Sequence, residues 1–211
     1  MQSNRMEINS ASENLQVIRT LMERTALYRR TLAPIMLYIG ALGMVAAGVG
    51  VALDIEPLQQ FAALWLGTAV VAVAGAFFIA RLQALKDKES FWSAPTRRVA
   101  QALALPLTAG LALSIVIVTI GGENYRWPFI LPNVLFYACA AYSAGFFMPR
   151  GIQKFAWILL ILAIAALMFV PLYVTEPNPK LDHALMGFFF GVLHVAYGIY
   201  LRVTEQRKTA A

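Results

Sequence analysis

The sequence predicts an all-α fold: a polytopic transmembrane bundle of six helices, preceded by an amphipathic helix at the cytoplasmic face or the membrane interface. Three observations predict this fold class. Apolar segments of about 20 residues occur six times, and a helix of that length crosses the hydrocarbon core of a bilayer. Charged residues lie almost entirely between these segments. They make up 13% of the chain, whereas a soluble domain contains about 25%.

The apolar segments define the domain organisation. A cytoplasmic arm over residues 1–31 comes first, a transmembrane domain follows over 32–201, and a cytoplasmic tail over 202–211 ends the chain. The arm is polar and charged, so it does not resemble a signal peptide. Ser93 and Pro95 are typical of a helix start, which we place shortly before the third span. The six expected spans cover residues 32–53, 61–80, 99–120, 127–148, 155–174 and 181–201.

The distribution of Lys and Arg predicts the orientation of the bundle. Of the 17 such residues, fifteen lie in the arm, in the second and fourth connections and in the tail. The other three connections contain only Arg126 and Lys180. Cytoplasmic loops carry the excess of positive charge in multi-pass proteins, so we expect both termini in the cytoplasm. We also expect anionic lipid head groups, and no nucleic acid, as partners of these basic residues.

Residues 10–30 are expected to form the amphipathic helix. Ser10 and Glu13 fit a capping box, and apolar residues recur after them at spacings of three and four. Three placements of this helix stay open: on the anionic inner leaflet, against the cytoplasmic ends of the spans, or on a partner protein. The candidates for interfacial or partner contact are Arg19, Arg24, Arg29, Arg30, Arg97 and Arg98.

Small residues predict which faces of the spans pack together. Helices in lipid associate where small side chains let their backbones approach. Such residues recur at helical spacing on the first and last spans. The candidates for helix packing are Gly40, Gly43, Ala47, Gly187, Gly191 and Gly198. His194 falls on the stripe of the last span, so we expect its side chain to point into protein.

Polar side chains within the spans are few. No Asp, Glu, Lys or Arg lies deep in any expected span, although proton-coupled carriers usually need such a group. An unpaired polar group is costly in hydrocarbon, so the polar groups that are present should pair inside the bundle. Asn133 lies in the outer third and His194 in the inner third, so we do not expect them to meet. The candidates for interior polar positions are Asn133, Tyr137, Tyr142 and His194.

His194 is the strongest single candidate for a functional residue, and three roles stay open. It is a hydrogen-bonded packing residue, a proton-sensitive or substrate-contacting group, or a haem ligand. No carboxylate or thiolate companion lies at metal-ligand spacing from it. His183 is roughly 16 Å away along the helix, too far to share one iron. We therefore predict no metal site and no cofactor, with haem as the alternative.

The residue patterns of common hydrolases do not occur in the spans. The expected spans contain no paired carboxylates and no Ser–His–Asp arrangement. Neither Ser114 nor Ser143 lies in a Gly-x-Ser-x-Gly context. Cys139 is the single cysteine, so an intrachain disulfide is excluded. We accordingly predict no catalytic residue, and an enzyme is the less favoured class.

Two short stretches carry a resemblance to other sequences. They are residues 91–100 (FWSAPTRRVA) and 145–152 (GFFMPRGI), which together cover under a tenth of the chain. Both resemble segments of uncharacterised bacterial inner-membrane proteins with six predicted spans. The resemblance implies a location in the bacterial inner membrane and lends no activity.

Three functions remain in competition. The first is a non-enzymatic integral membrane protein that binds a partner, regulates it or senses the bilayer, and it depends on the basic arm and the uncharged interior. The second is a small oligomeric transporter or channel for a neutral or weakly polar solute, supported by the glycine stripes. The third is a haem- or quinone-binding redox protein, which depends on His194 alone. A homo-oligomer or a protein partner is compatible with the first two.

Overall fold

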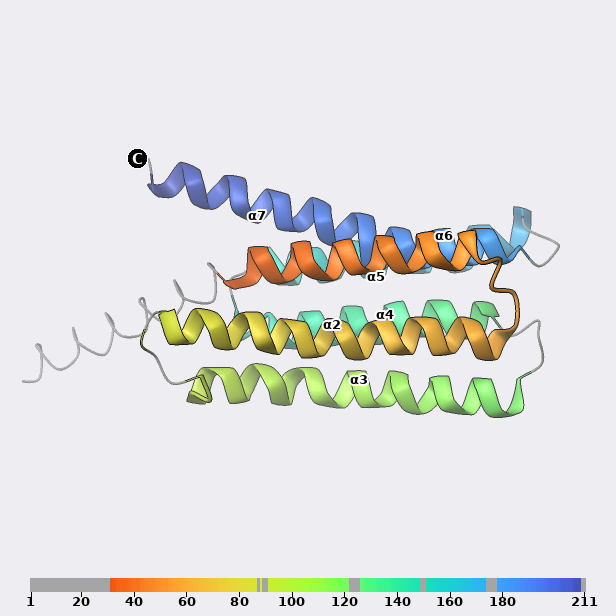
Figure 1. Ribbon diagram of the computed structural model, residues 1–211, viewed down its shortest axis with the longest axis horizontal. Helices are drawn as coiled ribbons and strands as arrows, with labels where there is room; N and C mark the ends of the chain where they lie inside the picture. Colours follow the sequence, from red (N-terminus) through yellow and green to blue (C-terminus); the bar gives the residue numbers. More distant parts are fainter. Residues whose placement is uncertain are drawn as a thin grey trace, which may run out of the picture.

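The computed structural model describes residues 31–86, 88, 91–121, 126–148, 151–173 and 178–209. Within these ranges every regular element is a helix, and the helices lie side by side as a bundle (Figure 1). The amphipathic helix predicted over residues 10–30 lies outside the described residues, and so do Arg19, Arg24, Arg29 and Arg30.

The helices follow the apolar segments of the sequence. The first described helix spans Thr31–Ala52. After it come α2 (Leu58–Lys86), α3 (Ala94–Ile120), α4 (Arg126–Ala144) and α5 (Gly151–Tyr173). The chain then forms one continuous helix in three parts, which we call the last helix: α6 (Pro179–Gly187), the π-helical turn η1 (Phe188–Val192) and α7 (Leu193–Thr209).

Five helices of the described chain are long and apolar enough to cross a membrane, and they fit a multi-pass membrane protein in a lipid bilayer. They are Thr31–Ala52, Leu58–Lys86, Thr96–Ile120, Gly151–Phe169 and Pro179–Thr204. Helix α4 occupies most of the fourth expected span but is not among the five. Pro132, Asn133 and Tyr137 interrupt its apolar sequence, and such residues lower its mean hydropathy.

Successive helices run in opposite directions, so the start of the first helix and the end of α7 lie at the same end of the bundle (Figure 1). We call this the basic end, because exposed Lys and Arg side chains gather there. The connection 53–57 and the ends of α3 and α5 lie at the opposite end. The even alternation brings residues far apart in the sequence to the same level of the bundle.

Local sequence sets several helix ends. Helix α3 begins after Ser93 with a proline in its first turn, which confirms the predicted start. Helix α6 begins after Asn178, whose side-chain oxygen accepts a hydrogen bond from the backbone N–H of Leu181 at 3.1 Å. Asp54 follows the first helix at φ 52°, in the left-handed region that Asp adopts more readily than most residues.

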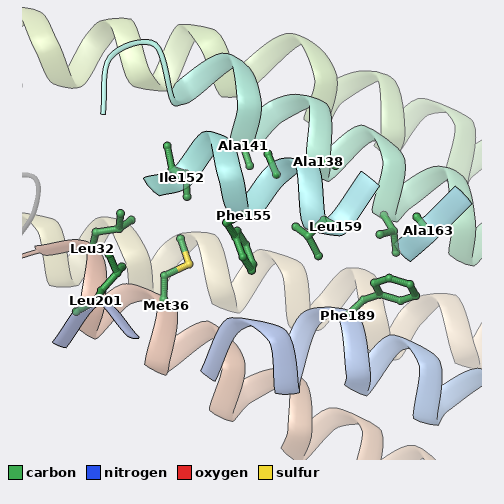
Figure 2. Close-up of a cluster of buried hydrophobic side chains, with 13 residues drawn as sticks. Leu32, Met36, Ala138, Ala141, Ile152, Phe155, Leu159, Ala163, Phe189 and Leu201 are labelled. Carbon is green, nitrogen blue, oxygen red and sulfur yellow. The ribbon is translucent and has the colours of Figure 1, made fainter. Parts of the chain in front are cut away.

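Buried apolar side chains form two clusters, one toward each end. The cluster toward the basic end joins the first helix, α4, α5 and the last helix, and includes Leu32, Phe155 and Leu159 (Figure 2). The cluster toward the opposite end joins the first helix, α2, α3, α4 and α6, and includes Phe61 and Phe129. Among the described residues, α2 and α3 therefore contribute to these two clusters only toward the opposite end.

Small residues let the first helix lie close against the last one. A Cβ atom added at Gly43 would lie 2.6 Å from the carbonyl oxygen of Phe190, and one at Gly191 would lie 2.7 Å from Cγ of Met44. The neighbouring contacts of the same interface pair Gly40 with Val195, Ala47 with Gly187, and Leu37 with Gly198. Larger side chains at the glycine positions would push the two helices apart, so this interface positions the last helix and its two histidines.

Candidate functional site

The buried polar side chains of the last helix lie in two clusters, one around His194 and one around His183. His194 is fully buried. Its Nε2 atom lies 2.8 Å from the hydroxyl oxygen of Tyr137 on α4, and its Nδ1 atom lies 2.9 Å from the backbone carbonyl oxygen of Phe189. We call these residues, together with the adjoining rings of Phe155 and Phe190, the His194 cluster.

The π-helical turn places the Phe189 carbonyl in reach of the His194 ring. That carbonyl lies five residues before the histidine, within η1. Because a carbonyl oxygen only accepts hydrogen bonds, Nδ1 of His194 must carry the proton and donate it. In a neutral ring Nε2 is then the acceptor, and the Tyr137 hydroxyl donates to it. The hydrogen bonds thus fix one tautomer of the ring.

Aromatic rings enclose His194 on several sides. Phe155 meets the imidazole edge-on at 5.0 Å between ring centroids, and Phe190 stacks on it at 6.0 Å. Tyr197 continues the series by stacking on Phe155 at 4.6 Å. Both nitrogens of His194 are engaged within this packed surrounding, so ligation of a haem iron would require one hydrogen bond to break. The geometry therefore favours the packing and hydrogen-bonding role among the three.

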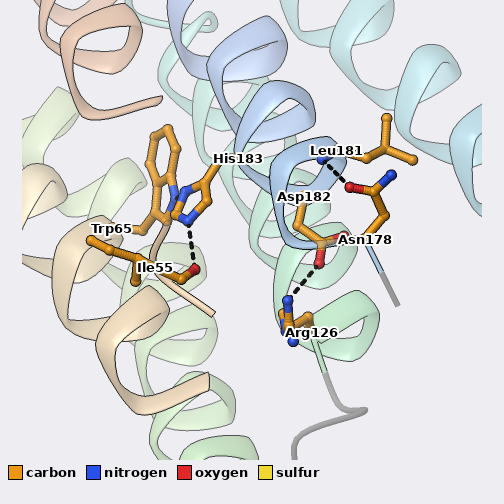
Figure 3. A network of polar contacts seen from close by, with 7 residues as sticks. All are labelled: Ile55, Trp65, Arg126, Asn178, Leu181, Asp182 and His183. Carbon is orange, nitrogen blue, oxygen red and sulfur yellow. Dashed lines mark hydrogen bonds and ion pairs between the residues drawn. The ribbon is translucent and has the colours of Figure 1, made fainter. Parts of the chain in front are cut away.

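The second cluster lies at the opposite end and contains charged residues (Figure 3). Asp182 of α6 is 3% exposed, and Arg126 at the start of α4 is 8% exposed. The Nη1 atom of Arg126 donates to Oδ2 of Asp182 at 3.4 Å. The other carboxylate oxygen, Oδ1, is buried without a hydrogen-bond partner. The ion pair therefore satisfies only half of the carboxylate.

His183 is the next residue along α6 and is fully buried. Its Nε2 atom donates to the backbone carbonyl oxygen of Ile55 at 3.1 Å, and its Nδ1 atom accepts from the indole N–H of Trp65 at 3.2 Å (Figure 3). Phe61 packs beside the ring at 4.7 Å between centroids. We call Ile55, Trp65, Arg126, Asp182 and His183 the His183 cluster. It ties the first connection, α2 and α4 to the last helix.

Gly50 lets the first helix approach His183 closely. A Cβ atom added at Gly50 would overlap Cε1 and Nδ1 of the imidazole ring. The absence of a side chain on this glycine therefore makes room for the histidine, and the ring fills the space between the first helix and α2.

Asn133 has one hydrogen-bond partner on α3 and another on its own helix, α4. Its amide nitrogen donates to the hydroxyl of Ser114 at 2.8 Å and to the carbonyl oxygen of Phe129 at 2.7 Å. Ser114 in turn donates to the carbonyl oxygen of Gly110 at 2.8 Å. This bond set joins α3 to α4. Tyr137, one turn further along α4, bonds to His194 instead.

The other described residues that the sequence singled out lie at the surface or in helix interfaces. Tyr142 is 37% exposed and contacts the rings of Phe146 and Trp157. The side chains of Arg97 and Arg98 are exposed in the first turns of α3, at the basic end. The glycines of the two stripes lie between the first helix and the last one.

The His183 cluster was not foreseen from the sequence. Arg126, Asp182 and His183 border the expected spans, where a charged residue is ordinarily a solvated flank. The available indication was the adjacent pair Asp182-His183 at the start of an apolar helix, opposite Arg126 at the start of another. Among the residues that the structure describes, no three His, Cys, Asp or Glu side chains lie close enough together to hold a metal ion.

Comparisons of the chain with models of protein families, with curated proteins and with solved structures found no match.

Proposed function

We propose that this chain is a non-enzymatic, multi-pass membrane protein that binds a partner protein or senses the bilayer. The observation that supports it best is the pairing of interior polar side chains with one another. His194 bonds to Tyr137 between the last helix and α4, and Asn133 bonds to Ser114 between α4 and α3. Polar groups used in this way hold neighbouring helices in register. The surface is then the part of the protein that acts on other molecules.

We further propose that α4 is a sixth span. Its 19 residues give a helix of about 28 Å, close to the hydrocarbon thickness of about 30 Å. Helix α4 packs along both α3 and α5, and it runs alongside them through the bundle (Figure 1). Six spans are consistent with both termini on one side of the membrane.

The charges support an orientation with the basic end in the cytoplasm, as in a bacterial inner-membrane protein. Exposed basic side chains at this end come from four helices and one connection: Arg81, Lys86, Lys88, Arg97, Arg98, Lys154 and Arg202. At the opposite end, Arg126 pairs with Asp182, and Lys180 lies 3.7 Å from Asp54. Positive charge is therefore exposed at one end and paired with carboxylates at the other, as the positive-inside rule requires.

Cysteine labelling tests this orientation. In a Cys139→Ala background, Lys88→Cys reports on the basic end and Lys180→Cys on the opposite end of the full-length protein. We expect a membrane-impermeant maleimide to label position 180 in intact bacterial cells and position 88 only after permeabilisation. Labelling of both positions in intact cells would contradict the proposed orientation.

Site-specific photo-crosslinking tests for a protein partner. A photoreactive amino acid replaces Lys154 at the basic end or, as the matched control, Lys180 at the opposite end. A discrete adduct from position 154 alone supports partner binding at the cytoplasmic face. The same adducts from both positions, or none from either, contradict partner binding. Bilayer sensing is then the remaining proposed function.

A small transporter or channel is the second candidate, because of η1. This π-helical turn interrupts the most buried of the five candidate spans, and π-turns inside helices often mark functional sites. Solute or ion flux across liposomes that contain the purified protein would favour this candidate. Flux that is unchanged by His194→Gln and Tyr137→Phe would show that the His194 cluster does not line the path.

A further inference from the structure

The halves of α2 and α3 nearest the basic end lie outside the core. From Leu66 to Lys86 the one buried side chain is Ala84, and no described side chain from Thr96 to Ala109 is buried. Helices α2 and α3 form a hairpin, and apolar side chains cover this part of it. We call residues 66–86 and 96–109 the hairpin surface. Its exposed members include Phe78, Leu82, Leu85 and Leu105. Such a surface needs an apolar cover.

Basic side chains are concentrated at the tip of the same hairpin. Four of them are exposed: Lys86 at the end of α2, Lys88 just after it, and Arg97 and Arg98 at the start of α3. Residues 81–98 contain five basic and two acidic residues, a net charge of +3. None of the four named cations forms an ion pair with a carboxylate of the described chain.

An exposed indole belongs to the same connection as these charges. Phe91 packs edge-on against Phe77 of α2 at 6.1 Å between ring centroids, and Trp92 beside it is 53% exposed. The contact with Phe77 holds the connection against α2. Tryptophan favours the depth of the head groups, because its ring is apolar and its N–H reaches water.

We propose that the hairpin surface binds an anionic phospholipid. The phosphate lies among Lys86, Lys88, Arg97 and Arg98, and the acyl chains lie along the apolar side chains of α2 and α3. The match is one of charge and shape, since an anionic lipid has a negative head above an apolar tail, and the hairpin has cations above apolar residues. The inference rests on the proposed membrane function and names the bilayer component that is recognised.

Two sets of basic residues at the same end allow a matched test. Arg97 and Arg98 belong to the hairpin surface, whereas Lys154 and Arg202 are exposed on α5 and α7, two helices that contribute to the core at this end. The paired variants Arg97→Gln/Arg98→Gln and Lys154→Gln/Arg202→Gln remove the same charge. All four side chains are on the surface, so both variants should fold.

The experiment is a titration of phosphatidylglycerol into the full-length protein in neutral detergent, followed by native mass spectrometry. We expect the hairpin variant to bind the lipid on the order of 20-fold more weakly, since each cation near an anionic head group contributes a factor of about five. We expect the control variant to bind within about twofold of the wild type. Phosphatidylcholine should bind weakly to all three proteins.

Several outcomes would overturn the proposal. Equal weakening in both variants would mean diffuse attraction to the whole basic end. Protection by inorganic phosphate alone, measured by thermal unfolding, would mean that a free anion and not a lipid is recognised. A dimer in the native spectra that the double substitution Leu82→Glu/Leu85→Glu abolishes would identify a second copy of the chain as the cover. None of these results depends on the orientation or partner tests, so the two proposals fail separately.

Discussion

His183 and His194 lie on the same helix, both fully buried and both with two hydrogen-bonded ring nitrogens, yet they adopt opposite tautomers. His194 donates through Nδ1 to the carbonyl of Phe189, and His183 donates through Nε2 to the carbonyl of Ile55. In each case the carbonyl decides the tautomer, and the second nitrogen then accepts from Tyr137 or Trp65. Neither ring has a nitrogen left for a further ligand.

The surroundings of the two rings differ in charge. The His194 cluster consists of neutral and mostly aromatic side chains. The His183 cluster includes the Arg126–Asp182 ion pair, whose second carboxylate oxygen has no partner. A buried charge that loses its counter-charge is far more costly than a buried neutral group that loses one hydrogen bond. The comparison therefore predicts that the His183 cluster is the more sensitive to substitution.

The largest effect is expected from Asp182→Ala, because it leaves the buried guanidinium of Arg126 without a counter-charge. We expect a loss of about 3–5 kcal/mol in the free energy of unfolding. The measurement is reversible unfolding of the full-length protein in mixed detergent micelles, followed by circular dichroism.

The control removes both charges together. The double substitution Asp182→Leu/Arg126→Met should recover most of the lost stability, because apolar residues of similar size often replace a buried ion pair at little cost. A double variant as unstable as Asp182→Ala would show that packing, and not the uncompensated charge, dominates this cluster.

A smaller effect is expected at the interface between the first helix and the last helix, which positions both clusters. Gly43→Ala places a methyl group 2.6 Å from the backbone of Phe190, and overpacking of this kind costs about 1–3 kcal/mol. On the same helix, a Cβ atom at Gly48 meets nothing within 4 Å, so Gly48→Ala should be neutral or slightly stabilising. Equal unfolding midpoints for the two variants would contradict a close approach of the first and last helices.

Two tyrosines, one in the His194 cluster and one beside it, can be compared directly. Tyr137→Phe removes the donor to Nε2 of His194 and should lower the free energy of unfolding by about 1–2 kcal/mol. The hydroxyl of Tyr197 is buried without a hydrogen-bond partner, so Tyr197→Phe should be neutral or stabilising. The comparison fails if both variants lose the same stability in the unfolding assay.

The smallest effect is expected from Lys180→Gln. The Lys180–Asp54 pair lies at the same end as the His183 cluster, but both side chains are more than 60% exposed. Water screens such a pair, so we expect a change within about 0.5 kcal/mol. A loss comparable to that of Asp182→Ala would remove burial as the reason for the difference between the two ion pairs.

Much of the fold was predictable, because burial in lipid imposes long apolar segments. The helical fold class and the helix start at Ser93 and Pro95 follow from composition and local sequence. The expected count of six spans is not confirmed at α4, where Pro132, Asn133 and Tyr137 dilute the apolar residues. Those same residues include the polar groups that bond α4 to its neighbours, so the feature that weakens the span prediction strengthens the packing.

The site was predictable only in part. Spacing identified His194 as a residue that faces protein, but no pattern along the chain connects it to Tyr137, which is 57 residues away. The same holds for Arg126 and Asp182, which are 56 residues apart. Both pairs depend on how α4 packs against the last helix, and a single sequence carries no direct record of that contact.

The π-helical turn has a consequence for the angular phase of the last helix. In an uninterrupted α-helix, residues 11 apart point within about 20° of each other, so His183 and His194 would face the same neighbour. The wider turn of η1 rotates everything after it. His183 therefore faces α2, His194 faces α4 and α5, and Val195 takes the position against Gly40. One extra residue in a helical turn therefore lets a single helix present its two histidines to different neighbouring helices.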